Sequence, residues 1–98
     1  MPERTKISRL HIRVKGRVQG VGFRAHVDYT ARALAVTGWV RNVGYDVVEA
    51  VAEGEREKLE QLAAAIKSGP GGSHVDDATV EWNDPTGEFE RFIVRRSI

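Results

Sequence analysis

The chain has 98 residues, of which 41% are hydrophobic and 30% charged, with 15 Lys plus Arg against 14 Asp plus Glu. This length and composition predict one soluble globular domain over residues 1–98, and the balanced charge excludes a global field that would steer the chain to nucleic acid or a membrane surface. The absence of cysteine excludes disulfides, thiolate metal ligands and thiol nucleophiles.

The stretch from residue 1 to residue 10 is charged and has no apolar run, so it does not resemble a signal peptide. No part of the chain approaches the roughly 20 apolar residues that a membrane-spanning helix needs. We therefore expect a cytoplasmic protein.

The first predicted strand contains Leu10, Ile12 and Val14, which alternate with charged residues. This period of two indicates a strand with one buried face. A glycine-rich loop follows, and apolar residues at helical spacing then predict a helix over residues 23–35.

Two valine-rich stretches, residues 37–43 and 45–54, predict strands, the second of them ending at Gly54. Because the connection between them is short, we expect an antiparallel hairpin.

A second amphipathic helix is predicted to end at the Gly-Pro-Gly-Gly sequence of residues 69–72. Its apolar face consists of Leu59, Leu62, Ala63 and Ile66. Alternating residues 78–82 predict a fourth strand, residues 83–88 a turn, and residues 92–94 a short last strand.

The predicted order is strand, helix, strand, strand, helix, strand, with one extra short strand. Two strand–helix–strand units around a central hairpin favour a ferredoxin-like α+β sandwich of βαββαβ order, in which both helices cover one face of an antiparallel sheet. Four aromatic side chains are expected to fill the core: Phe23, Trp39, Trp82 and Phe92.

The loop sequence GRVQGVGFR, residues 16–24, allows several interpretations. Gly20 to Ala25 matches the dinucleotide-binding pattern, but that pattern needs an acidic residue about 20 positions further on, and Arg41 and Asn42 stand there. A Walker loop is excluded because no lysine or hydroxyl residue follows the last glycine.

A glycine-rich turn that runs into a helix presents free backbone N–H groups and the positive end of the helix dipole. Arg24 would lie in the first helical turn, where a cation is disfavoured unless an anion binds beside it. A solvated arginine next to an ordinary turn and an anion site both stay open. Asn42 could form local hydrogen bonds in the hairpin turn, or it could lie near Arg24 at the end of the second strand.

Two motifs, GRVQGVGFR at residues 16–24 and GWVRN at residues 38–42, resemble those of the acylphosphatase family. With VVEAVAEG and SGP further on, the resemblance covers nearly the whole chain. It implies metal-independent hydrolysis of the carboxyl–phosphate anhydride in small acyl phosphates, without a cofactor.

In the family, the motif arginine and the loop backbone bind phosphate, and the motif asparagine positions the attacking water. The resemblance therefore assigns catalysis to Arg24 and Asn42, and substrate binding to Gly16, Arg17, Val18, Gln19, Gly20 and Val21. It implies an acyl phosphate as the substrate and inorganic phosphate as product and inhibitor. We expect a monomer that binds neither nucleic acid nor membranes.

The chain departs from the family at two turns. Tyr45-Asp46 stands where the family often has Asp-Gly, and Ala35 stands where it often has glycine. Neither departure affects Arg24 or Asn42.

Other functional classes use the same order of elements. An RNA-recognition domain would carry stacking aromatic residues on its central strands, and residues 10–14 and 47–52 contain none. A non-catalytic anion-binding domain would keep Arg24 and the glycines but would have no need of Asn42. The histidines share no metal-ligand spacing, and Asp76-Asp77 is expected in a solvated turn.

Overall fold

Five strands and two helices follow one another in the computed structural model, which describes residues 6–98. The first five residues of the stretch considered as a signal peptide therefore lie outside the described residues. The elements are β1 (Ile7–Arg17), α1 (Phe23–Ala33), β2 (Thr37–Val43), β3 (Val47–Glu55), α2 (Arg56–Ser68), β4 (His74–Asn83) and β5 (Phe92–Val94).

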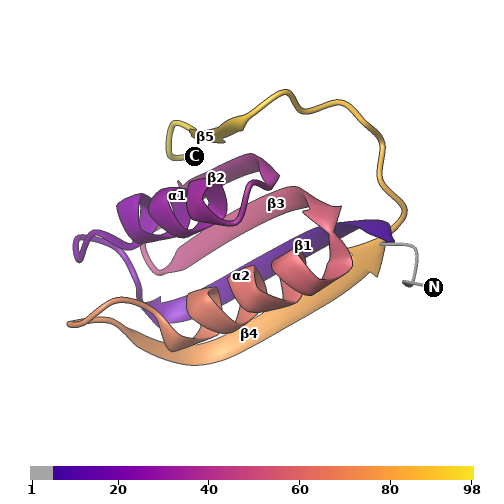
Figure 1. Ribbon diagram of the computed structural model, residues 1–98. Coiled ribbons are helices and arrows are strands. Elements are labelled where there is room, and N and C mark those ends of the chain that lie inside the picture. Colours follow the sequence, from indigo (N-terminus) through magenta and orange to yellow (C-terminus); the bar gives the residue numbers. More distant parts are fainter. Residues whose placement is uncertain (1–5) are drawn as a thin grey trace.

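The strands form one sheet in the order β4-β1-β3-β2-β5, and α1 and α2 lie on the same face of it (Figure 1). The first four strands pair antiparallel. The expected ferredoxin-like α+β sandwich is confirmed. The short β5 pairs parallel with β2, so the complete sheet is mixed.

The core lies between the helices and the sheet. Leu10, Ile12 and Val14 are fully buried, because alternate side chains of a strand point to the same face. They pack in one cluster with the apolar face of α2. Phe23 and Phe92 also belong to this cluster, as predicted.

Both tryptophans were predicted to fill the core, but neither ring is fully enclosed by it. Trp39 lies on the sheet face opposite the helices, with the guanidinium carbons of Arg41 and Arg95 at 4.7 and 4.9 Å from its ring. Trp82 is partly buried and packs against the core as predicted, and the guanidinium of Arg56 lies 3.7 Å from its ring. Cation–π contacts therefore cover rings that the core does not enclose.

Helix α1 ends at Ala33, two residues earlier than predicted. Leu34 caps the helix, and Ala35 adopts a left-handed backbone with φ 59°. A residue with a Cβ atom loses about 1–2 kcal/mol in that conformation, which explains why glycine suits this position. At the next boundary, Gly54 does not end β3, which continues through Glu55.

Residues 84–91 do not form the predicted tight turn. They form an irregular segment that carries the chain from β4, at one edge of the sheet, to β5 at the other edge (Figure 1). The Asp76-Asp77 pair lies within β4, so its assignment to a turn was wrong.

Glu53 of the sheet binds this irregular segment, and the residue is only 5% exposed to solvent. Its carboxylate accepts hydrogen bonds from the backbone N–H groups of Thr86 and Gly87, both at 2.9 Å, and from Arg9 at 2.6 Å. Burial raises the pKa of Glu53, but these hydrogen bonds outweigh burial and lower the pKa to about 2.

A carboxyl group with a lowered pKa stabilises the fold above its unfolded pKa, and that stability is lost as the pH falls toward the folded value. Since each pKa unit is worth about 1.4 kcal/mol, we expect roughly 1–3 kcal/mol of stability to be lost between about pH 4.5 and pH 2. Urea unfolding of Glu53→Gln should show a lower free energy of unfolding at pH 7 and a shallower fall in acid. Glu60→Gln, at an exposed ion pair on α2, is the control and should behave as wild type.

Candidate active site

The loop between β1 and α1 has a backbone that glycine makes possible. Gly20 and Gly22 have φ values of 75° and 76°, in the left-handed region. Gly22 is the N-cap residue of α1, and neither a side-chain cap nor an acidic residue occupies the first turn. The N–H of His26 donates to the carbonyl oxygen of Gly22 at 3.0 Å. The N–H groups that precede His26 in the first helical turn have no carbonyl partner within the helix. An anion bound at a helix N-terminus contacts such groups.

Gln19 fastens this loop to the turn between β2 and β3. Its Nε2 donates to the carbonyl oxygens of Val47 at 2.9 Å, Gly44 at 3.2 Å and Val43 at 3.4 Å. The backbone N–H of Gly16 adds a hydrogen bond to the carbonyl of Asp46 at 2.9 Å. These contacts hold the end of β2, which carries Asn42, beside the loop.

A cavity of about 340 Å³ opens where the loop, the start of α1 and the end of β2 meet. Arg24 and Asn42 both line it, although 18 positions separate them in the sequence. The remaining lining residues are Val18, Gln19, Gly20, Gly22, Phe23, Ala25 and Val94.

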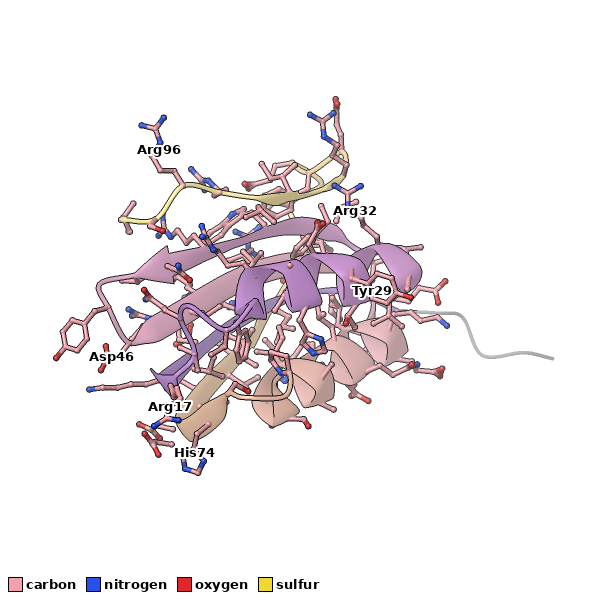
Figure 2. The ribbon with its side chains drawn as sticks, turned by 90° about the vertical axis from the view of Figure 1, so that its left-hand side faces the viewer. Arg17, Tyr29, Arg32, Asp46, His74 and Arg96 are labelled. Atoms are coloured by element: carbon pink, nitrogen blue, oxygen red, sulfur yellow. The ribbon has the colours of Figure 1, made fainter. Side chains whose placement is uncertain are left out.

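The predicted binding residues do not all reach this cavity. Gly16 and Arg17 belong to the end of β1, and the side chain of Arg17 lies beside His74 at a different hollow of the surface (Figure 2). Val21 packs against the core. Of the predicted substrate-binding residues, Val18, Gln19 and Gly20 therefore line the cavity.

Four lining residues were not among the predicted site residues. Gly22, Phe23 and Ala25 flank Arg24, so the helix start itself was their signal. Val94 had no signal in the sequence, because its place depends on the pairing of β5 with β2.

The C-terminal residues 95–98 contact both candidate catalytic residues. Nη1 of Arg24 donates to the carbonyl of Arg95 at 3.3 Å and to Oγ of Ser97 at 3.4 Å. The backbone N–H of Ile98 donates to the carbonyl of Asn42 at 3.0 Å. Since a guanidinium has five N–H groups, those on Nε and Nη2 lie outside these contacts.

The histidines lie apart from one another. His11 is on the open sheet face, with Nε2 2.6 Å from a carboxylate oxygen of Glu49. His26 is on α1, edge-on to Phe23 with ring centroids 6.4 Å apart. Within residues 6–98, no three His, Cys, Asp or Glu side chains are grouped so that they could hold a metal ion. In that same range, no helix has the length and apolar character to cross a bilayer.

The fold and the cavity together define a ferredoxin-like α+β sandwich in which a glycine-rich loop and an arginine at the start of the first helix share a cavity with an asparagine from the second strand. The acylphosphatase family model matches residues 10–94 of this chain. The chain belongs to the acylphosphatase family, and it is an enzyme that hydrolyses acyl phosphates.

Individual relatives agree with this assignment. The acylphosphatase of Syntrophotalea carbinolica is 51% identical over 87 residues, which cover 89% of this chain and 95% of that protein. The crystal structure of the Bacillus subtilis acylphosphatase has a TM-score of 0.85 at 36% identity, covering 90% of this chain and 98% of that one. The BLUF protein BlrB, with a TM-score of 0.66 at 18% identity over 93% of this chain and 74% of its own, shows the fold alone.

Proposed function

We propose that this chain hydrolyses small acyl phosphates in the cavity at the N-terminus of α1. The guanidinium of Arg24 and the loop N–H groups bind the phosphate, and the carboxamide of Asn42 orients the attacking water. The observation that carries this proposal is that Arg24 and Asn42 come from separate elements and line one cavity.

Phosphate binding uses the start of α1. Backbone N–H groups at a helix N-terminus point toward a bound anion, and the helix dipole favours negative charge there. Arg24 is in the first turn of α1, where its positive charge opposes the dipole until an anion lies between them. The guanidinium can then donate two parallel hydrogen bonds to phosphate oxygens.

The chemistry needs few groups. The leaving group is a carboxylate, whose conjugate acid has a pKa of about 4 to 4.5 if it resembles Asp and Glu side chains, so it leaves without a proton. The water oxygen forms a bond to phosphorus while the bond from phosphorus to the acyl oxygen breaks. The electron pair of the broken bond stays on the carboxylate. The proton of the water passes to a phosphate oxygen.

Because the transition state of phosphoryl transfer is loose, positioning and charge stabilisation supply most of the catalysis. A strong general base is then not required. The neutral carboxamide of Asn42 suits this task, because its oxygen accepts from water while its NH₂ group donates.

The test is phosphate release by the purified protein. We expect turnover of acetyl phosphate and benzoyl phosphate, an unchanged rate in excess EDTA, competitive inhibition by inorganic phosphate, and the mass of a monomer by light scattering. Loss of activity in EDTA would contradict the metal-independent mechanism. Tight phosphate binding without turnover would instead support a non-catalytic anion-binding domain.

A further inference from the structure

The strand β5 places one apolar side chain at the candidate active site. In the parallel pairing with β2, the partner of Val94 is Val40. Alternate side chains of a strand share a face, so Val94 is on the side of Phe92, which is buried in the core, and Ile93 is on the opposite side. Val94 is 46% exposed, at the point where this face leaves the core and reaches the cavity.

Val94 is also next to the phosphate-binding side chain. Its neighbour in sequence, Arg95, accepts a hydrogen bond from Nη1 of Arg24 at 3.3 Å. An occupant held by the Arg24 guanidinium would therefore extend past Val94 on one side.

The cavity lining has two chemical kinds of residue. Gly20, Gly22 and Arg24 supply N–H donors or close backbone approach for an anion. The exposed side chains of Ala25 and Val94 are purely apolar and cannot bind phosphate oxygens. An acyl phosphate has the same division, with an anionic phosphate at one end and an acyl chain at the other.

We propose that Val94, together with Ala25, forms an apolar subsite for the acyl group, so that acyl phosphates with branched or aromatic acyl chains are better substrates than acetyl phosphate. This proposal rests on the proposed function. The physical basis is that a larger acyl group covers more of the exposed Val94 surface, and each Å² of apolar surface removed from water contributes about 25 cal/mol.

The experiment compares kcat/KM for benzoyl phosphate and acetyl phosphate in Val94→Ala and Val94→Thr, the second of which has a similar shape but replaces a methyl group by a hydroxyl. In both variants we expect the benzoyl-to-acetyl ratio to fall about three- to tenfold, since up to two methyl groups of contact are lost. We expect kcat/KM to fall more for benzoyl phosphate than for acetyl phosphate, because the single methyl group of the acetyl chain covers less of this surface.

Ile93→Ala is the matched control. Ile93 is the adjacent residue of the same strand and is 39% exposed, but it faces away from the cavity. Its ratio should equal that of wild type, and thermal melting of all three variants reports whether β5 stays in place. An unchanged ratio in folded Val94 variants that still hydrolyse acetyl phosphate would overturn the subsite and leave the proposed function intact. Failure of the wild type to hydrolyse either substrate would overturn both.

Discussion

Replacement of Arg24 by alanine is expected to lower kcat/KM for acetyl phosphate by about 10²–10³-fold, because one donor to a developing oxyanion is worth about 3–4 kcal/mol. The loss should appear in both parameters. In the proposed mechanism KM rises because the guanidinium binds the phosphate of the substrate, and kcat falls because charge shifts onto the phosphate oxygens in the transition state. Steady-state kinetics with a phosphate-release assay measure both.

Two further variants separate charge from geometry. Arg24→Lys keeps the charge but loses the planar two-point grip, so we expect only partial activity. Arg96→Ala removes the same charge from an exposed side chain that projects into solvent (Figure 2) and should leave the kinetics unchanged. Wild-type turnover by Arg24→Ala would rule out the phosphate-binding role.

Replacement of Asn42 by alanine is expected to lower kcat by about 10²-fold with KM within about threefold of wild type, since in the proposed mechanism its carboxamide orients water and does not hold the phosphate. The backbone of Asn42 should stay in place, because β2 pairs it with Val48 and its carbonyl accepts from Ile98. The affinity for inorganic phosphate, measured as the inhibition constant, should therefore change little.

The matched control is Asn83→Ala, at the exposed end of β4 and outside the cavity, which should retain wild-type kcat. Asn42→Asp keeps the shape but adds a negative charge beside the phosphate, so its KM should rise. A rise of KM in Asn42→Ala with kcat unchanged would assign Asn42 to binding instead of water positioning.

The architecture could be predicted from the sequence because its signals are local. Apolar residues alternate with polar ones around Ile12 and recur at helical spacing up to Ile66. Both patterns follow directly from which face of each element is buried. The hairpin between β2 and β3 was predictable from its short connection. The position of Arg24 in the first helical turn followed from the glycine loop immediately before it.

Features that depend on pairing across the sheet could not be predicted in this way. Residues 84–91 contain turn-forming residues, but their path follows from the buried carboxylate of Glu53, far away in sequence. The partner of β5, and with it the place of Val94, has no local signal. Trp39 was assigned to the core by residue type, although Val40 beside it is the side chain of β2 that enters the core.

The hydrogen bonds from Gln19 to the hairpin turn mean that the glycine-rich loop and the strand carrying Asn42 are joined before any substrate arrives. Enzymes that reject poor substrates by induced fit couple the binding of the right one to assembly of the catalytic groups. A site that is already assembled cannot select in that manner. Its discrimination among acyl phosphates then depends on the shape and polarity of the cavity.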